Sequence, residues 1–413
     1  MSEPRVGRVG FFAPDWPPER FANGIVTYTG SMRLGLGQLG VKTLVLSADL
    51  ASDVRTDDVI DIKDALKARS SLERARDALW RRVDPRGAAV SRAGRSLART
   101  LRAVHARTPC DLFEIEESLG FGISALGTGI PTIVRLHGPW FLNGAALGVP
   151  RDRDFRRRDA NERRLVAAAD AISAPSQDVL NRVRDHFGLA LENACVVPNP
   201  APEPAERWSS AACEPHSLLF VGRFDRHKGG DLVIDAFREL ARDDPQTRLY
   251  FVGPDRGLEL PSGGRTSLPE YLASRVSEAR IRERIEVLGP LPHPEVERMR
   301  ARAGVVVVAS RYEVLPLTAI EALSAGCPLV APDAGGIPEI VEHGRSGLCF
   351  VAGDAQALAS RLRILLRDRE LAAQLGAEAR RVYAQRFTPA AVASQALEFY
   401  ATVRGRGSRP GGR

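Results

Sequence analysis

Residues 218–237, LLFVGRFDRHKGGDLVIDAF, place a short apolar run, a polar loop and an amphipathic helical pattern in that order. This is the order of a strand, a loop and a helix, the unit from which parallel sheets are built. At such a junction the free amides and the dipole of the helix start point at any anion in the loop. Arg223 and Lys228 lie five residues apart in the loop, and Lys228 is one of only four lysines in the chain. The loop is therefore a candidate anion site, and the alternative is an ordinary loop with surface bases.

Similar apolar runs alternate with helical patterns on both sides of this stretch. We expect strands near 6–11, 41–47, 111–115, 131–136, 171–175 and 195–198, and then near 217–222, 248–253, 284–289, 305–310 and 327–332. This alternation is typical of βαβ units. Each half of the chain is therefore predicted to be an α/β domain of its own.

A proline-rich stretch separates the two halves. Residues 199–215 contain four prolines, and proline cannot continue a helix or a central strand. Near the end of the chain, an apolar stripe on a predicted helix needs a surface to cover it. The predicted organisation is an N-terminal domain over 1–200, a linker over 201–216, a C-terminal domain over 217–387, a helix over 388–404 and a disordered tail over 405–413.

The overall composition is that of an ordinary globular protein, with 44% hydrophobic and 26% charged residues among 413. No apolar stretch approaches the roughly 18 to 20 residues of a membrane span, and the first residues lack the apolar core of a signal peptide. The five cysteines are odd in number and include no Cys-x-x-Cys pair, which argues against zinc and disulfides. We therefore expect a cytoplasmic protein.

The net charge of +7 is concentrated in one segment. From Asp61 to Arg107 there are 13 basic residues against 5 acidic ones, an excess larger than that of the whole chain. Most basic residues of the chain are arginines, which indicates a genome-wide bias, and only Trp80 in this segment could stack on a base. We therefore expect no nucleic-acid binding. Residues 61–108 are predicted to be a basic helical insertion that is either solvated, which we favour, or in contact with an anionic membrane surface.

Two motifs match ligand-binding patterns, but the strands and helices predicted around them are not those that such binding sites require. Gly35, Gly37 and Gly40 spell G-x-G-x-x-G, but a helical stretch precedes them and a strand follows, the reverse of a dinucleotide site. Gly40 is expected to end that helix. Asp152-Arg-Asp154 spells the D-x-D of metal-dependent sugar transferases, yet no apolar strand precedes it. We expect a solvated charged helix there and no metal site.

A second strand, loop and helix follow at 305–326, with two glutamates eight residues apart. Glu313 falls in the loop after the strand, and Glu321 lies about one turn into the helix. Carboxylates so placed could accept hydrogen bonds from hydroxyls at different ends of one ligand. As a bare spacing the signal is weak, because glutamates on helices are usually solvated.

Several of these segments have a family resemblance when they are taken together. The stretches VGRFDRHKGG, EVLPLTAIEALSAGCPLVAPDAGGIPEIVEHGRSG, LVAAADAISAPSQDVL and VVPNP resemble the retaining GT-B glycosyltransferases of family 4, which carry a Glu-x7-Glu signature. The resemblance extends from about Val6 to Ala401. It implies two Rossmann-like domains that face each other across a cleft. It also implies a nucleotide-sugar donor in the C-terminal domain and a last helix that returns to the N-terminal domain.

The resemblance implies roles for residues of the C-terminal domain. Arg223 and Lys228 would neutralise the donor diphosphate. Glu313 would bind the transferred sugar, and Glu321 the ribose hydroxyls. Amide hydrogen bonds to sugar and phosphate would come from the loop formed by Val314, Leu315, Pro316 and Leu317. The family usually has Glu-Gly-Phe-Gly here, so this loop is stiffer and lacks one amide at Pro316.

Two positions of the N-terminal domain also match the family. Asn23 and Gly24 take the place of its glycine-rich loop after the first strand, where a small residue lets the backbone approach a phosphate. His137 takes the place of its active-site histidine beside the donor sugar, whereas a lone histidine is more often structural.

The implied reaction moves a sugar to a nucleophilic acceptor with retention of configuration, without a metal or other cofactor. Fixed cations and helix N-termini would stabilise the leaving diphosphate. A sugar-nucleotide epimerase and a catalytically silent binding protein are the competing hypotheses. We favour a small cytoplasmic metabolite or natural product as acceptor over a lipid or a polysaccharide. The sequence does not specify the donor nucleotide, the acceptor or the oligomeric state.

Overall fold

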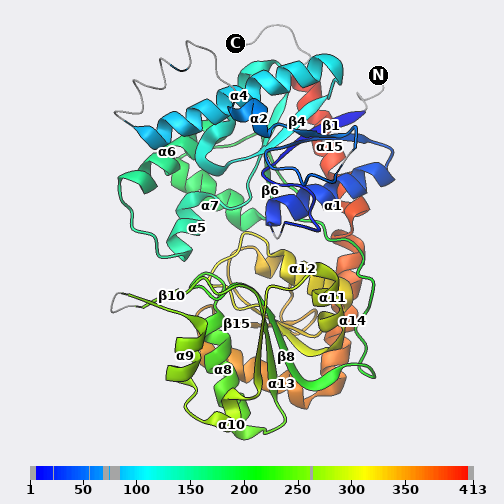
Figure 1. The fold of residues 1–413 in the computed structure, drawn as a ribbon. Coiled ribbons are helices and arrows are strands. Elements are labelled where there is room, and N and C mark those ends of the chain that lie inside the picture. The colour runs from blue at the N-terminus through cyan, green and yellow to red at the C-terminus, as the bar shows by residue number, and fades with distance from the viewer. Residues whose placement is uncertain are drawn as a thin grey trace. The chain divides into compact units, whose positions relative to one another are not determined.

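A computed structural model describes residues 6–407 except 22, 55, 68–73, 75–83 and 261–263, and its residues group into two α/β units (Figure 1). Unit 1 comprises Met1–Phe141, Arg151–Pro198 and Pro389–Arg413, and unit 2 comprises Leu142–Pro150 and Asn199–Thr388. Each unit is built around one parallel sheet with helices on both faces. The predicted class of two Rossmann-like domains is confirmed.

Unit 1 contains a seven-stranded parallel sheet with the order β3-β2-β1-β4-β5-β6-β7. Its strands are β1 Arg8–Ala13, β2 Lys42–Ser47, β3 Val59–Asp61, β4 Leu112–Glu116, β5 Thr132–Arg135, β6 Ala171–Ala174 and β7 Ala194–Val196. The chain order reverses between β1 and β4. In open α/β sheets, ligands bind at the carboxyl ends of the strands beside such a reversal.

The helices of unit 1 connect these strands and cover both faces of the sheet. They are α1 Gly24–Gln38, α2 Lys63–Lys67, α4 Pro85–Arg107, η1 Ser118–Ser124, η2 Leu126–Thr128, α5 Trp140–Ala146, α6 Arg153–Ala168, α7 Gln177–Phe187 and α15 Pro389–Gly407. Helix α1 precedes β2 and ends before Gly40, which has a φ of +75°. The predicted helix stop at Gly40 is confirmed, and the G-x-G-x-x-G match is not a strand-to-helix turn.

The last helix, α15, completes unit 1. It lies side by side with α1 (Figure 1), and Val392, Ala396 and Tyr400 are buried. The approach is so close that a Cβ on Gly35 would lie 2.0 Å from the carbonyl oxygen of Pro389. The Tyr400 hydroxyl donates a hydrogen bond to the buried Glu114 carboxylate at 2.7 Å. The apolar stripe of α15 is therefore covered by the core of unit 1.

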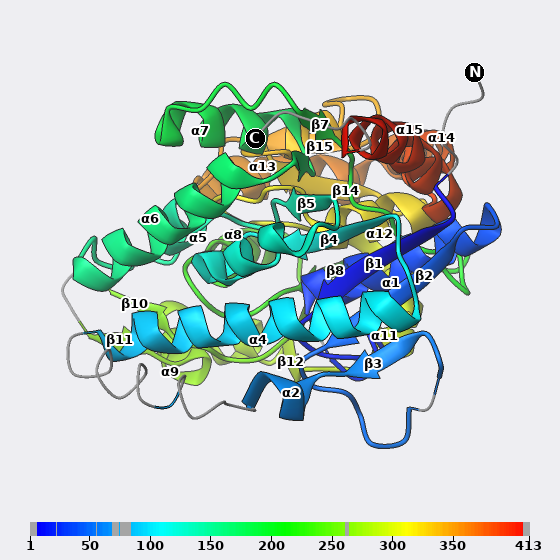
Figure 2. The same cartoon turned by 90° about the horizontal axis from the view of Figure 1, so that it is seen from above.

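The described part of residues 61–108 is packed more closely into the domain than the predicted solvated insertion would be. Helix α4 is the connection that leads from the β3 side of the sheet to β4, and Leu97 and Leu101 on it are fully buried. Helices α2 and α4 lie side by side (Figure 2). The solvated-insertion hypothesis is therefore wrong for Pro85–Arg107, since one face of α4 packs into the domain. The parts of the prediction over 68–73 and 75–83 lie outside the described residues.

Three boundaries in the structure also differ from the predicted ones. Strand β8 begins at Glu214, inside the predicted linker, because its first residue already pairs with Ala303 of β13. Helix α15 continues to Gly407, so 405–407 are helical rather than disordered, and 408–413 lie outside the described residues. Residues 142–150, predicted to belong to the N-terminal domain, group with unit 2.

Unit 2 contains a six-stranded parallel sheet with the order β12-β9-β8-β13-β14-β15. Its strands are β8 Glu214–Val221, β9 Arg248–Val252, β12 Ile285–Gly289, β13 Ala303–Val307, β14 Leu329–Pro332 and β15 Leu348–Phe350, and a separate hairpin pairs β10 Leu258–Glu259 with β11 Arg265–Thr266. The central strands β8 and β13 are neighbours. Because they are parallel, the loops that follow them emerge at the same edge of the sheet.

Two apolar layers enclose this sheet. The helices of unit 2 are α8 Gly230–Asp243, α9 Leu268–Arg275, α10 Ala279–Arg282, α11 His293–Arg302, α12 Leu317–Ala325, η3 Ile337–Glu339, α13 Ala355–Arg367 and α14 Arg369–Arg386. Phe237 of α8 and Leu362 of α13 belong to one core cluster, and Ile320 of α12 and Tyr383 of α14 to another. Among the residues that the structure describes, no helix combines the length and apolarity needed to cross a bilayer.

Candidate functional site

Arg223 and Lys228 lie where predicted, in the loop between the central strand β8 and helix α8. Asp225, which the sequence analysis did not single out, orients both of them. Its carboxylate accepts a hydrogen bond from Nε of Arg223 at 2.7 Å and another from the backbone N–H of Lys228 at 2.7 Å. The terminal guanidinium nitrogens of Arg223 have no partner within the described part of the chain, and its side chain is 41% exposed. They remain available to an anion.

Glu313 follows β13 and meets Lys228 across the two loops. The Lys228 ammonium forms an ion pair with Oε1 of Glu313, which also accepts a hydrogen bond from the Ser310 hydroxyl at 2.8 Å. Burial alone would raise the pKa of Glu313, but the charges of Lys228 and His227 hold that pKa below its ordinary value. An ammonium has three protons. Lys228 can therefore pair with Glu313 and still donate to a second oxygen ligand.

Further contacts tie these two loops together. The His227 imidazole lies 2.7 Å from the carbonyl oxygen of Tyr312, and the Arg311 amide donates to the carbonyl of His227 at 2.9 Å. The Arg311 guanidinium makes two hydrogen bonds, at 3.0 and 2.7 Å, to Asp231 in the first turn of α8. These contacts fix the spacing between the predicted cation and the predicted carboxylate.

Two helices begin at this edge of the sheet without a capping side chain. Gly229 precedes α8 and Pro316 precedes α12, and neither has a side-chain acceptor for the first amides. Gly229 has a φ of +71°, and a Cβ there would lie 2.0 Å from the carbonyl oxygen of Ala309, so only glycine fits. Unpaired first-turn amides and the helix dipole favour an anion. Because Pro316 stands before the first turn, its missing N–H leaves the amides of Leu317 and Thr318 in place.

The side chains of Val314 and Leu315 point into unit 2, with exposures of 8% and 3%. Leu315 belongs to an apolar cluster, and its carbonyl oxygen accepts a hydrogen bond from the Asn199 side chain at 2.8 Å. Only backbone groups of these two residues can therefore serve a ligand, as the resemblance implied.

Glu321 lies in the second turn of α12, and a buried arginine holds it. Arg300, 2% exposed, donates to Oε2 of Glu321 at 2.6 Å, and Nε2 of His293 lies 3.7 Å from Oε1. Burial alone would raise the pKa of Glu321, but Arg300 and His293 hold it below its ordinary value. The side chain keeps 15% exposure. Arg300 and His293 were not predicted, because only the tertiary fold brings α11 beside α12.

In unit 1, His137 follows β5 by two residues at the carboxyl edge of the sheet. Its ring packs edge-on against Tyr28 of α1, with 5.0 Å between the ring centroids. The fully buried Arg135 guanidinium lies 4.4 Å from the centroid of the same tyrosine. Burial, and then the charge of Arg135, lower the pKa of His137 well below its ordinary value. The imidazole is therefore neutral at pH 7 and can accept or donate one hydrogen bond.

Two buried carboxylates, which the sequence analysis did not identify, hold the loop after β5. The two oxygens of Glu117 accept hydrogen bonds from the amides of His137 and Gly138 at 2.9 and 2.7 Å. Glu162 of α6 accepts one from the amide of Trp140 at 2.7 Å. The only sequence signal was a pair of consecutive glutamates at the end of a predicted strand. Residues that act through backbone amides leave no motif.

Asn23 and Gly24 begin helix α1 after the first strand. The Asn23 side chain accepts a hydrogen bond from the amide of Ile25 at 3.0 Å and donates one to Asp15 at 3.2 Å. Its oxygen therefore caps the helix. Contact of Asn23 and Gly24 with a phosphate stays a prediction.

The D-x-D match forms the start of a helix. Asp152 caps α6 by accepting a hydrogen bond from the Phe155 amide at 2.8 Å, and Asp154 forms ion pairs with Arg86 and Arg157. Both carboxylates thus have structural partners. Across the described residues, no three His, Cys, Asp or Glu side chains are grouped so that they could hold a metal ion.

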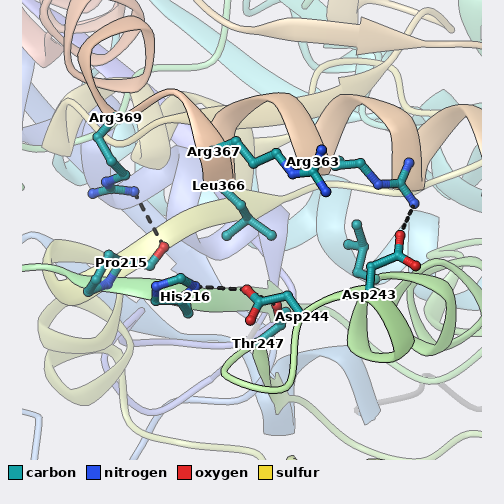
Figure 3. A pocket seen from close by; sticks show the side chains of 10 residues that line it. Pro215, His216, Asp243, Asp244, Thr247, Arg363, Leu366, Arg367 and Arg369 are labelled. Atoms are coloured by element: carbon teal, nitrogen blue, oxygen red, sulfur yellow. Dashed lines mark hydrogen bonds and ion pairs between the residues drawn. The ribbon is translucent and has the colours of Figure 1, made fainter.

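A pocket of about 350 Å³ lies at the opposite end of the unit 2 sheet from Arg223, at the amino end of β8 (Figure 3). Its polar lining is already paired in part: His216 lies 2.9 Å from Asp244, and Arg363 lies 3.1 Å from Asp243. Ligands of parallel sheets bind at the carboxyl ends of the strands. The candidate site is therefore the edge that carries Arg223, Lys228 and Glu313.

Comparison with known proteins covers most of the chain. Residues 22–202 match the family model of Glycosyltransferase Family 4, and residues 203–382 match that of Glycosyl transferases group 1. Over 258 residues the chain aligns with glycogen synthase of Mycobacterium tuberculosis at 30% identity, which covers 62% of this chain and 59% of that protein. It also aligns with D-inositol 3-phosphate glycosyltransferase of Geodermatophilus obscurus at 33% identity over 61% of this chain and 57% of that protein. The chain thus spans about three fifths of the length of these relatives.

A solved structure shares the fold over almost the whole chain. HepE of Anabaena, crystallised with UDP-glucose, superimposes with a TM-score of 0.66 at 18% sequence identity and covers 96% of this chain and 99% of its own. At this identity the likeness concerns the fold.

Proposed function

Because the chain belongs to the glycosyltransferases, whose two family models together extend over residues 22–382, we propose that it transfers a sugar from a nucleoside-diphosphate sugar to a nucleophilic acceptor. The observation that carries this proposal is the Lys228–Glu313 pair at the carboxyl edge of the unit 2 sheet. It places a cation with spare donors beside a carboxylate that can bind hydroxyls. A diphosphate and a sugar need those two kinds of group side by side.

In the proposed reaction, the bond between the anomeric carbon and the diphosphate oxygen breaks, and the electron pair leaves with the diphosphate. Arg223, Lys228 and the two uncapped helix starts would stabilise the charge that develops there, because they are already oriented before reaction. The acceptor oxygen would attack from the face that the diphosphate leaves, and a phosphate oxygen would take its proton. This gives retention of configuration without a metal or other cofactor.

The remaining residues would bind the donor. Glu313 would accept hydrogen bonds from hydroxyls of the transferred sugar, and Glu321 from the ribose hydroxyls, since neighbouring basic side chains hold the pKa of both below its ordinary value. His137, neutral at pH 7, would hydrogen-bond to the sugar without adding charge. Amides of the Val314, Leu315 and Leu317 backbone and the start of α1 at Asn23 and Gly24 would complete the set.

UDP-glucose is the first donor to test, because HepE binds it on the same fold. A small polar metabolite is our proposed acceptor, a class that includes the substrate named for the inositol phosphate relative. Such an acceptor suits a cytoplasmic enzyme. A membrane acceptor is the second candidate, because helix α4 carries six arginines and no acidic residue.

The test is a screen of UDP-, GDP- and other nucleotide sugars by thermal shift, followed by nucleoside diphosphate release with and without candidate acceptors. We expect one donor to raise the melting temperature and to release its diphosphate faster when an acceptor is present. Release of a free, epimerised sugar without any acceptor would favour the epimerase instead. Absence of both stabilisation and release for every nucleotide sugar would contradict the proposal.

A further inference from the structure

Two buried carboxylates, which lie on different elements, accept hydrogen bonds from the backbone of the loop from His137 to Trp140. Glu117, 1% exposed, follows β4, and its two oxygens bind the amides of His137 and Gly138. Glu162, also 1% exposed, lies on α6 and binds the amide of Trp140. Because Pro139 has no N–H, all three backbone N–H groups of this short loop donate to buried carboxylates.

Glu162 also secures the neighbouring loop. Its Oε1 accepts a hydrogen bond from the amide of Leu119 at 3.1 Å and another from Nε of Arg158 at 2.9 Å. Leu119 has a φ of +59°, a left-handed conformation that a leucine adopts only when surrounding contacts impose it. Glu162 thus binds the backbone at a residue whose conformation needs support from its surroundings.

Burying the charged form of the Glu117 carboxyl group costs the fold free energy. Burial, reinforced by the charge of Glu162, raises the pKa of Glu117 to about 8. An apolar residue would avoid that cost but would leave the loop amides without acceptors.

We propose that Glu117 is a positioning residue that fixes His137 for sugar transfer, with Glu162 holding the far end of the same loop. The inference rests on the proposed function, in which His137 contacts the transferred sugar. Glu117 touches no substrate in this scheme and acts only through the backbone of His137 and Gly138.

The diagnostic substitution is Glu117→Gln, because an amide nitrogen has no lone pair to accept a backbone N–H. One of the two loop amides then faces another donor. We expect kcat to fall by about 10²-fold, the scale reported for a misplacement of about 1 Å at a reacting centre. KM for the donor should stay within about threefold, because the diphosphate and ribose groups are assigned to unit 2.

The matched control is Glu116→Gln, the same change at the adjacent residue. Glu116 is also buried, at 7% exposure, and no hydrogen bond joins it to the amides of 137–140 among the described contacts. Its kcat should stay within about threefold of wild type. Equal losses in the two variants would contradict a role specific to Glu117.

A double-mutant cycle with His137→Ala separates positioning from general destabilisation. If Glu117 acts through His137, adding Glu117→Gln to His137→Ala should lower kcat by less than about threefold further. The proposal is overturned if Glu117→Gln costs the same factor in both backgrounds. Should Glu117→Gln not fold, Glu117→Asp, which keeps two acceptors on a shorter side chain, takes its place in the cycle.

Hydrogen exchange makes the test independent of any substrate. In the wild-type chain, the amides of His137 and Gly138 should exchange at least 10³-fold more slowly than in an unfolded peptide, and Glu117→Gln should accelerate them selectively. Unprotected amides in the wild type would overturn the inference even if the enzyme were active. Protected amides in a protein that turns over no nucleotide sugar would instead refute the proposed function alone.

Discussion

Replacing Arg223 by alanine is expected to lower kcat by about two orders of magnitude while leaving the fold intact. The guanidinium side chain is 41% exposed, and its one described hydrogen bond runs from Nε to Asp225. Such a partly exposed pair contributes about 0–1 kcal/mol to stability. A preoriented cation at a developing negative charge contributes about 3 kcal/mol to transition-state stabilisation, which corresponds to a factor of roughly 160 at 25 °C.

Lys228→Ala should behave differently, because the ammonium also serves the fold. Its removal leaves the Glu313 carboxylate, 10% exposed, with the Ser310 hydroxyl as its remaining hydrogen-bond donor among the described contacts. Breaking a buried pair by removing one partner costs about 3–5 kcal/mol when burial is complete. We therefore expect Lys228→Ala to lose both activity and melting temperature, whereas Arg223→Ala loses activity alone.

Initial rates of nucleoside diphosphate release over a range of donor concentrations, together with thermal unfolding, measure both effects. Arg226→Ala is the matched control, since Arg226 lies exposed in the same loop and has no assigned role. It should keep kcat within about threefold. The reasoning is refuted if Arg223→Ala is as active as Arg226→Ala, or if its activity falls only in step with a lower melting temperature.

Four other predictions follow from the same geometry. Glu321→Gln is expected to raise KM for the donor about tenfold with little change in kcat, because ribose is bound equally before and during reaction; a loss wholly in kcat would contradict the ribose role. Excess EDTA should leave turnover unchanged, and a strict requirement for Mg²⁺ or Mn²⁺ would count against the proposed mechanism. Burial raises the pKa of Glu117 to about 8 and that of Glu116 to about 7, against about 4.3 in an unfolded chain. The folded protein therefore binds more protons between these values, and the free energy of unfolding should fall as pH rises from about 5 to 8. Urea titrations at pH 5.5 and 8.5 should show a smaller fall for Glu116→Gln than for wild type, and an equal fall would show that Glu116 does not titrate in this range. Phosphatidylglycerol vesicles at low salt should leave the protein in the supernatant, whereas co-sedimentation reversed by salt would move the acceptor towards a membrane lipid.

The sequence predicted most strands of both sheets because parallel, fully buried strands are short apolar runs bounded by loops. It missed β3 and β15, which have three residues each and no distinctive run. It also misjudged α4, because arginines dominate that helix while small residues and two leucines form its buried face. From its sequence alone, such a helix is predicted to be solvated, because its buried face is recognised only when the neighbouring elements are known.

The candidate site likewise contains residues that the sequence analysis singled out and residues that it missed. Arg223, Lys228 and Glu313 could be singled out as candidates because they stand in loops directly after strands, and the family resemblance then implied their roles, which stay predictions. Asp225, Arg300 and Glu117 were missed because each acts on another residue's backbone or charge, through contacts formed only in the tertiary structure. Sequence reading thus found the groups expected to touch substrate and missed those that orient them.

The place of α15 in the core of unit 1 determines when that unit can be finished during synthesis. The ribosome makes the seven strands of unit 1 first, yet Tyr400, which hydrogen-bonds to Glu114, emerges 286 residues later. Until then the surface of α1 around Gly35 has no partner, while almost all of unit 2, Asn199–Thr388, is one continuous stretch of chain. The second domain can therefore complete its core before the first, and a nascent chain stalled between the two would expose the apolar residues of unit 1 that α15 covers, a surface prone to aggregation.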